Sequence, residues 1–373
     1  MLRLHFLLPG LAPLLFACAA EDPPQIEASP APDISEAVEP ETEAVDTSGP
    51  LMTRAQMEGL LQTIDVPGMA TATITSCEVT DVSTAGLAIV EPAMPVTPDT
   101  AFEAASLSKP VFAWLVMSLV DDSVIDLDEP FAETFEYPRI TDAENYAKLT
   151  PRLVLTHRTG LPNWVDETTD FWDRTAEIPF NTPPGDAFSY SGEGFQLLQI
   201  FIEQKTGKRL QQIFEERLGG VMANSTFAQP LPDTVIASRG YGSASDEESG
   251  RDMDNLYPRA VSAGSLVTTP GDLGAFLAMV CRREGLSAAS YEDMLTPQSP
   301  APGGPDMPSS SWSLGWMNAD MGEVTFIGHN GNNDEYKSFG GFLKETGDGL
   351  VILTNGARGD ELIGQIIGYT SPE

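Results

Sequence analysis

The sequence is poor in positive charge. Its 373 residues contain 20 lysines and arginines against 55 aspartates and glutamates, which gives a formal net charge of −35 at pH 7. A surface this negative repels nucleic acid and anionic lipid headgroups, because both carry dense negative charge themselves. We therefore expect neither of them as a partner.

Residues that bind metals and phosphates are scarce as well. Of the three histidines, His5 lies in the N-terminal apolar run, which leaves His157 and His329. The sequence has no His-Glu-x-x-His, no Cys-x-x-Cys and no cluster of His, Asp and Glu that indicates a catalytic metal. It also lacks Gly-x-Ser-x-Gly, the nucleophile elbow of α/β-hydrolases, and a glycine-rich phosphate loop. We expect a function that needs neither metal nor cofactor.

Cysteine occurs three times, and Cys18 stands in an instructive place. Arg3 precedes an apolar run, Leu4–Ala17, that is too short and too rich in proline and glycine to span a bilayer. The pattern predicts an export signal over residues 1–18. Either the signal is cleaved near Ala20, or Leu15-Phe-Ala-Cys18 is a bacterial lipobox whose cysteine is lipidated. We favour the lipobox, because a cysteine directly after Leu-x-Ala is what that signal requires.

The next segment, residues 19–50, has a composition that opposes folding. It carries nine acidic and no basic residues, many prolines and few large apolar side chains. Such a segment is expected to be a disordered tether, which would hold a folded domain, residues 51–373, away from a lipid anchor. Ala19, in place of the aspartate associated with inner-membrane retention, favours the periplasmic side of the outer membrane.

Cys77 and Cys281 remain. Export implies an oxidising compartment in which they could pair. They are equally ordinary as single buried cysteines. The sequence leaves both possibilities open.

The periodicity of the folded part changes twice along the chain. Alternating, β-branched patterns occur near the start and near the end, and helical patterns occupy most of the middle. This order predicts an α+β fold in which one antiparallel sheet is built from N- and C-terminal strands and flanked by helices, with a mainly helical insertion at about 131–260. The expected helices are 53–65, the helix that follows Ser106, 270–282 and 360–367; the expected strands are 69–75, a stretch up to 90, and a meander over 311–355. The polar stretch 231–259 is expected to be a surface excursion.

The segment Glu103-Ala-Ala-Ser-Leu-Ser-Lys-Pro110 places two serines close to a lysine. Residues three apart share one face of a helix, so Ser106 would face Lys109 while Ser108 points elsewhere. Serine needs a base before it is a nucleophile, and lysine can act as that base if burial keeps it partly neutral. The Ser-x-x-Lys spacing is weak evidence by itself.

Three further motifs strengthen it. Tyr190 lies in Phe188-Ser-Tyr-Ser-Gly192, and His329-Asn-Gly331 lies on a predicted late strand. In their order, and with Ala263-Gly-Ser-Leu-Val-Thr-Thr-Pro-Gly-Asp-Leu273, the chain resembles the serine β-lactamase and penicillin-binding superfamily. The resemblance is to the class C β-lactamase branch with its DD-peptidase and carboxylesterase relatives, and runs from about Met57 to Asn355.

The resemblance implies roles for individual residues. Ser106 would be the nucleophile, Lys109 its activator, and Tyr190 the residue that moves a proton to the leaving group and later activates water. The backbone N–H groups of Ser106 and Asn332 would form the oxyanion hole. Substrate would be bound around four positions: Gly192, His329, Gly331 and Tyr336. Trp164 is a further candidate for the pocket wall. We expect His157 to be structural.

Two departures and one decoy qualify the resemblance. Gly192 stands where the family's Tyr-x-Asn has an asparagine that binds the substrate amide, and His329 replaces the lysine of Lys-Thr-Gly. Both changes favour a substrate without the amide and carboxylate of a β-lactam. Lys205-Thr-Gly207 spells the third motif, but it follows an amphipathic run, so we expect an ordinary helix end there.

The sequence thus predicts an exported serine hydrolase that cleaves an ester or amide of a small-molecule or peptide substrate. The alternatives are a peptidoglycan DD-peptidase, a D-stereospecific peptidase, or a cell-wall-binding module that has lost turnover. Gly192 favours the last alternative, whereas the intact Ser106, Lys109 and Tyr190 oppose it.

Overall fold

The computed structural model describes residues 51–165, 172–246, 251–252, 257–300 and 310–368. The predicted signal, Cys18 and the predicted tether 19–50 lie outside these residues. Among the described helices, none has both the length and the apolar character required to cross a membrane.

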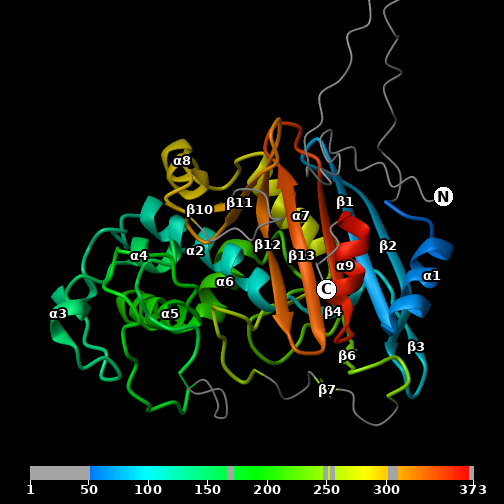
Figure 1. Cartoon of the computed structure of the whole chain (residues 1–373), viewed down its shortest axis with the longest axis horizontal. Helices are drawn as coiled ribbons and strands as arrows, with labels where there is room; N and C mark the ends of the chain where they lie inside the picture. The colour runs from blue at the N-terminus through cyan, green and yellow to red at the C-terminus, as the bar shows by residue number, and fades with distance from the viewer. Residues whose placement is uncertain (1–50, 166–171, 247–250, 253–256, 301–309, 369–373) are drawn as a thin grey trace, which may run out of the picture. The chain divides into compact units, whose positions relative to one another are not determined.

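Within the described residues, an antiparallel sheet of nine strands organises the fold (Figure 1). Its N-terminal strands form one side and its C-terminal strands the other, and they meet where β1 pairs with β14. This confirms the predicted fold class. In spatial order the strands are β3 (Met94–Pro95), β2 (Glu78–Ile89), β1 (Gly68–Thr75), β14 (Gly349–Thr354), β13 (Tyr336–Leu343), β12 (Thr325–Asn333), β11 (Met317–Asp320), β10 (Ser310–Trp312) and β9 (Ser299–Pro300).

Helices cover both faces of this sheet. Along β13, Lys337 lies against Gly359 of α9 (Gly359–Ile367), whereas Gly340 lies against Leu277 of α7 (Pro270–Cys281). Residues three apart in a strand point to opposite faces, so α9 and α7 pack on opposite sides. Helix α1 (Arg54–Ile64) contacts α9 and joins it. It begins at a capping box formed by Thr53 and Gln56, as its sequence leads one to expect.

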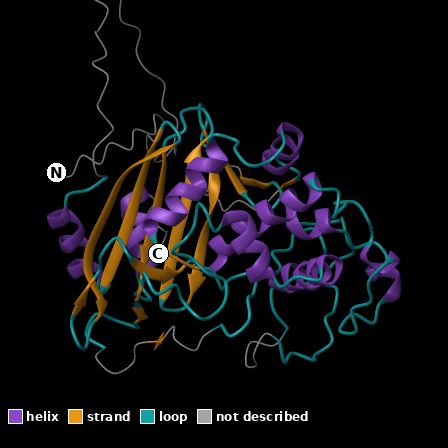
Figure 2. Cartoon of the chain, turned by 180° about the vertical axis from the view of Figure 1, so that it is seen from behind, coloured by secondary structure: helices purple, strands orange, loops and turns teal. Residues whose placement is uncertain are grey.

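The remaining helices gather beside the β9–β12 end of the sheet, away from β1 to β3, as Figures 1 and 2 show. Helices α3 to α6 lie within the expected helical region, 131–260. The elements of this part are η1 (Ala105–Leu107), α2 (Ser108–Asp121), η2 (Phe131–Glu133), α3 (Ala143–Tyr146), α4 (Pro151–Leu155), α5 (Gly192–Thr206), α6 (Leu210–Leu218) and α8 (Ala288–Leu295).

Most described residues of the stretch 231–259 are half-buried or exposed, as expected for a surface excursion, but a few of them pair with other strands or are buried. Its strand β5 (Ile236–Ala237) pairs with β4 (Thr100–Glu103), which also pairs with β8 (Val267–Thr268). A second short pair joins β6 (Arg239–Gly240) to β7 (Arg251–Asp252). Tyr241 is almost fully buried, and its hydroxyl accepts a hydrogen bond from Val90 N–H at 2.9 Å. The buried Tyr241 and a few strand pairings thus fix a polar segment to the rest of the fold. Its polar composition does not predict these contacts.

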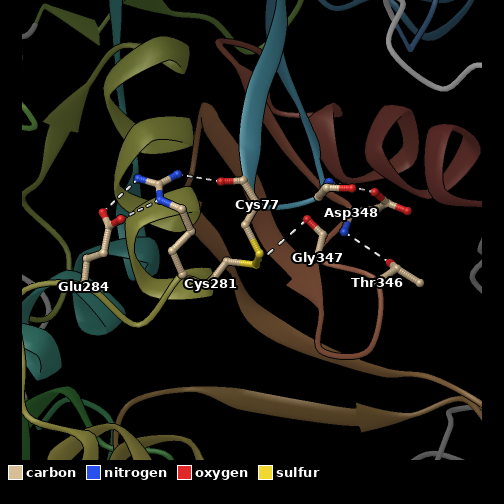
Figure 3. Close-up of a disulfide and its surroundings, with 8 residues drawn as sticks. Cys77, Cys281, Glu284, Thr346, Gly347 and Asp348 are labelled. Atoms are coloured by element: carbon tan, nitrogen blue, oxygen red, sulfur yellow. Dashed lines mark hydrogen bonds and ion pairs between the residues drawn. A yellow bond between two sulfur atoms is a disulfide. The ribbon is translucent and has the colours of Figure 1, made fainter.

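A disulfide joins Cys77, in the turn between β1 and β2, to Cys281 at the end of α7 (Figure 3). The turn between β13 and β14 lies against it: Cys77 N–H donates to Gly347 O at 2.8 Å. Gly347 has φ 74°, and a Cβ there would lie 2.6 Å from Cys77 Sγ, so only glycine fits this approach. Of the two possibilities that the sequence leaves open, the structure has the paired one.

The disulfide generates a prediction about stability. It closes a loop with a sequence separation of 204 residues, and cross-links of long loops typically stabilise the folded state by about 2–4 kcal/mol. We expect Cys77→Ala/Cys281→Ala in the full chain to lower the free energy of unfolding by about this amount, measured by urea denaturation. Peptide mapping of the unreduced protein is the control. Recovery of Cys77 and Cys281 as free thiols would contradict the pairing.

Candidate active site

Ser106 and Lys109 face each other at the start of the buried helix α2. Lys109 Nζ donates hydrogen bonds to Ser106 Oγ at 3.0 Å and to Ala263 O at 2.7 Å. The helix begins later than expected: Ser106 lies in the 3₁₀ turn η1, and α2 starts at Ser108. Ala105, just before the nucleophile candidate, has φ 49°, a conformation that L-residues rarely adopt and that surrounding structure must enforce.

Ser108 has a different environment from Ser106. It is fully buried. Its hydroxyl donates to Ala105 O at 2.6 Å and accepts from Leu266 N–H at 2.9 Å. Ser108 thereby fastens the strained Ala105 turn to the chain beside β8, which is a structural task.

Burial determines the protonation of Lys109. Its side chain is only 2% exposed, and its ammonium lies 4.7 Å from the ring centre of Tyr190 and 5.5 Å from that of Phe195. Desolvation lowers the pKa of Lys109 to about 7, because the charged form loses its water. A large share of the amine is therefore neutral near pH 7 and able to accept a proton from Ser106.

Tyr190 is held in place by His157. The two rings stack with centres 4.3 Å apart, and His157 Nδ1 accepts a hydrogen bond from Ser191 N–H at 3.0 Å. Burial raises the pKa of Tyr190 above its ordinary value, while a hydrogen bond with Ser106 opposes that shift. Tyr190 is thus a neutral phenol next to the serine, and His157 supports it from behind.

His329, on β12, faces Tyr190 from the other side. Its Nε2 lies 3.5 Å from Tyr190 Oη. Its Nδ1 is hydrogen-bonded to the carbonyl oxygen of Asn330, which only accepts, so Nδ1 carries the proton. Burial, together with the charge of Lys109, lowers the pKa of His329 to about 3. The residue that replaces the family's lysine is therefore uncharged at neutral pH.

The edge of β12 approaches the nucleophile turn. Strand β11 pairs with β12 from Thr325 to Gly328, whereas β12 continues to Asn333. A Cβ on Gly331 would lie 2.4 Å from Ala104 O and 3.0 Å from Ala105 Cβ, so glycine permits this contact. The backbone of Asn332, the predicted second oxyanion donor, follows directly.

Gly192, the first residue of α5, lies beneath an indole. A Cβ at this position would be 2.2 Å from Cζ2 of Trp164. Asn163 O accepts hydrogen bonds from the N–H groups of Gly192 at 3.1 Å and Glu193 at 2.9 Å, and the Arg174 guanidinium lies 4.8 Å from the centre of the Trp164 ring. Trp164 thus occupies the space into which a side chain at position 192 would extend.

The predicted role of Tyr336 is wrong. Tyr336 was expected to bind substrate, but it is fully buried and its hydroxyl donates to Ser238 O at 2.8 Å. Its ring packs so close to Gly240 that a Cβ there would meet it at 2.7 Å. Tyr336 is a core residue that fixes the segment after β5 against β13.

The decoy behaves as expected. Thr206 ends α5, and Gly207 is its C-cap in the left-handed conformation at φ 68°. Lys205 pairs with Glu129 at 2.9 Å. Lys205-Thr-Gly207 is therefore a helix end.

Four residues near the site were not singled out by sequence reasoning. The Trp312 ring lies 5.2 Å from that of His329 and 5.9 Å from that of Tyr190, and no sequence signal marks it. Ala263 holds Lys109 through its carbonyl oxygen, which no side-chain pattern can reveal. Glu103 accepts a partly buried hydrogen bond from Asn333. Within the described part of the chain, no three His, Cys, Asp or Glu residues are arranged to hold a metal ion.

A serine hydrogen-bonded to a buried lysine, with a tyrosine beside them and a large antiparallel sheet next to them, is the arrangement of a serine hydrolase. The model of the family described as Beta-lactamase matches residues 53–364, and the chain belongs to that family.

Individual relatives agree with this membership. Penicillin-binding protein 4 of Amycolatopsis lactamdurans is 25% identical, with 74% of this chain and 80% of that protein covered. Esterase EstB of Burkholderia gladioli is 30% identical over a shorter region, 34% of this chain and 37% of the esterase. The structure of D-amino acid amidase from Ochrobactrum anthropi SV3 shares the fold, with a TM-score of 0.70, 24% identity, and 84% of this chain and 98% of that one covered.

The different surroundings of the two serines predict different mutant phenotypes. Ser108→Ala leaves the buried Leu266 N–H without its acceptor, and we expect it to lower the free energy of unfolding by about 1–3 kcal/mol while the folded protein still hydrolyses substrate. Ser106→Ala should leave stability nearly unchanged and abolish turnover. Urea denaturation and ester hydrolysis on the same preparations check both. A folded but inactive Ser108→Ala would refute the structural assignment.

Proposed function

We propose that this chain hydrolyses carboxylic esters through an acyl-Ser106 intermediate. The observation that carries the proposal is the hydrogen bond between Lys109 Nζ and Ser106 Oγ, 3.0 Å long, made by an amine whose pKa is lowered to about 7. A general base works best when its pKa lies close to the working pH.

In the acylation step, Ser106 Oγ attacks the ester carbonyl carbon and passes its proton to Lys109 Nζ. The carbonyl electrons move onto oxygen, where the N–H groups of Ser106 and Asn332 receive the negative charge. The tetrahedral adduct collapses and breaks the bond to the leaving alcohol. As that bond breaks, Tyr190 Oη gives its proton to the departing alkoxide oxygen, which leaves as the alcohol, and Tyr190 recovers a proton from the Lys109 ammonium.

Deacylation uses the same groups in reverse. Water attacks the acyl carbon while its proton passes to Tyr190 Oη, which gives its own proton to the neutral amine of Lys109. The tetrahedral adduct then collapses: the bond between the acyl carbon and Ser106 Oγ breaks, the carboxylic acid leaves, and the Lys109 ammonium returns its proton to Ser106 Oγ. The raised pKa of Tyr190 and the Nδ1–H form of His329 fit this scheme, because a neutral phenol can then donate to Nε2 between proton transfers.

Two features favour esters over β-lactams. Trp164 occupies the space beside Gly192, so an amide-binding side chain is replaced by an apolar ring. His329, with its pKa lowered to about 3, offers no positive charge to a substrate carboxylate. Both features suit an acyl group that lacks the amide and carboxylate of penicillins.

A second candidate is cleavage of a D-amino-acid amide or of a peptidoglycan peptide. The names of the relatives favour it, since one is a penicillin-binding protein and another, similar in fold, a D-amino acid amidase. An amide substrate would need the same acyl-Ser106 step.

We also propose that the enzyme is exported and held by a lipid on Cys18 at the periplasmic side of the outer membrane. The Leu15-Phe-Ala-Cys18 sequence supports the anchor. A Cys77–Cys281 disulfide suits an oxidising compartment.

Ester hydrolysis tests the proposed reaction. We expect the full chain to hydrolyse a short-chain p-nitrophenyl ester, and Ser106→Ala to lose at least about a thousandfold in kcat, because the covalent step is gone. Intact-protein mass spectrometry of a slowly deacylating ester should show one added acyl group on wild type only. If wild type is inactive on esters but cleaves D-amino-acid amides, the second candidate replaces the first. If it cleaves neither, both candidates fail, and a selective peptidase or a binding module that has lost turnover replaces them.

The pH dependence of kcat/KM tests Lys109 as the base. Its neutral form, which accepts the proton, is scarce below its pKa of about 7 and dominant above it. We therefore expect kcat/KM to rise about tenfold per pH unit below pH 6 and to level off above about pH 8. Spontaneous ester hydrolysis at each pH is the control. A profile that rises only above pH 9 would mean that Lys109 titrates like an exposed lysine.

A further inference from the structure

A partly buried hydrogen-bond cluster lies beside the active site without belonging to the groups assigned above. Its centre is the side-chain NH₂ of Asn333, the last residue of β12. This group donates to Glu103 Oε2 at 2.6 Å, to Gly264 O at 3.1 Å and, more distantly, to Tyr257 Oη at 3.2 Å. Tyr257 Oη in turn donates to Glu103 Oε2 at 3.1 Å.

The cluster connects the chain segments that supply the reacting groups. Glu103 ends β4, three residues before Ser106. Gly264 follows Ala263, whose carbonyl oxygen binds Lys109 Nζ at 2.7 Å. Asn333 directly follows Asn332, the proposed oxyanion donor. From the end of β12, the Asn333 carboxamide therefore reaches both the segment that leads to Ser106 and the segment that binds Lys109.

The chemistry of the cluster suits a fixed position. Glu103 is fully buried, and a hydrogen bond to a buried carboxylate is stronger and more directional than one between neutral groups. Glu103 Oε2 and Gly264 O both accept, so the two hydrogens of one NH₂ can satisfy them at once. Neither an aspartate nor an apolar residue at position 333 can do this.

Other contacts also join these parts of the chain. Ser338 Oγ donates to Ala104 O at 2.7 Å, and β12 pairs with β13 along its length, from Phe326 to Asn333. Loss of the Asn333 side chain thus leaves the sheet intact and changes the alignment of its edge.

We propose that Asn333 is a positioning residue that fixes the end of β12, which carries the proposed oxyanion donor, relative to Ser106 and Lys109. Glu103 is the acceptor that anchors it. The proposal rests on the proposed ester hydrolysis at Ser106. Asn333 would act on the stability of the transition state, because a displacement of about 1 Å between the N–H donor and the oxyanion costs on the order of a hundredfold in rate.

The test compares kinetics of full-length variants in which donors and acceptors are exchanged. Asn333→Asp replaces the NH₂ with an acceptor, so the hydrogen bonds that it donates to Glu103 Oε2, Gly264 O and Tyr257 Oη are all lost. Glu103→Gln keeps an acceptor for Asn333. In Glu103→Gln/Asn333→Asp the new amide donates to the new carboxylate, which restores the link between positions 103 and 333 but not the link to Gly264. Asn181→Asp, at an exposed position, controls for the added negative charge.

We expect Asn333→Asp to lower kcat about a hundredfold and to keep KM within about threefold of wild type. The concentration of active sites is first measured by mass spectrometry, as the fraction of protein that a slowly deacylating ester acylates. Glu103→Gln and Asn181→Asp should retain kcat within about threefold, and the double variant should recover about tenfold over Asn333→Asp. A purely structural role would lower the thermal midpoint without changing kcat per active site.

The outcomes separate the two proposals. If wild type hydrolyses the ester and Asn333→Asp keeps its kcat, the positioning role is wrong while the proposed function stands. If Ser106→Ala retains full activity, the proposed function itself fails. Should Asn333→Asp not fold, the double variant decides: wild-type kcat there would overturn the role of the Gly264 link, and a kcat about tenfold below wild type would support it.

Discussion

The active site depends on keeping one amine out of water. Lys109 is enclosed by the rings of Tyr190 and Phe195 and retains two oxygen partners, Ser106 Oγ and Ala263 O. Each partner comes from a different part of the chain, so the helix α2, the N-terminus of α5 and the segment before β8 must close together before the lysine is a base. Lys109 can therefore act as a base only once these segments have folded together.

The sheet places the second half of the chemistry. Because β12 continues beyond its pairing with β11, its last residues can face the turn that holds Ser106. Gly331 removes the side chain that would separate them. The two histidines then take separate tasks: His157 supports the ring of Tyr190, and His329 meets its hydroxyl. Both are uncharged near neutral pH because they are buried, which keeps additional positive charge away from Lys109.

Local patterns in the sequence predicted what local forces determine. Periodicity located α1 and α7, and the spacing of Ser106 and Lys109 identified the central pair. Contacts between distant segments were harder to predict. Tyr336 reads as a strand-end aromatic, but Ser238, which binds its hydroxyl, is far away in the sequence. Likewise the pairing of Cys77 with Cys281, the burial of Tyr241 and the bond between Asn333 and Glu103 depend on the finished fold, which no spacing rule encodes.

Trp164 has a consequence for how this site can change over generations. An asparagine at position 192 collides with the indole, and a smaller residue at position 164 leaves Gly192 facing an empty space. Each replacement alone is unfavourable, although together they would recreate an amide-binding corner. An asparagine at position 192 is therefore separated from the present sequence by a step that needs two coordinated substitutions, and selection that acts on one codon at a time tends to retain the Gly192–Trp164 pair.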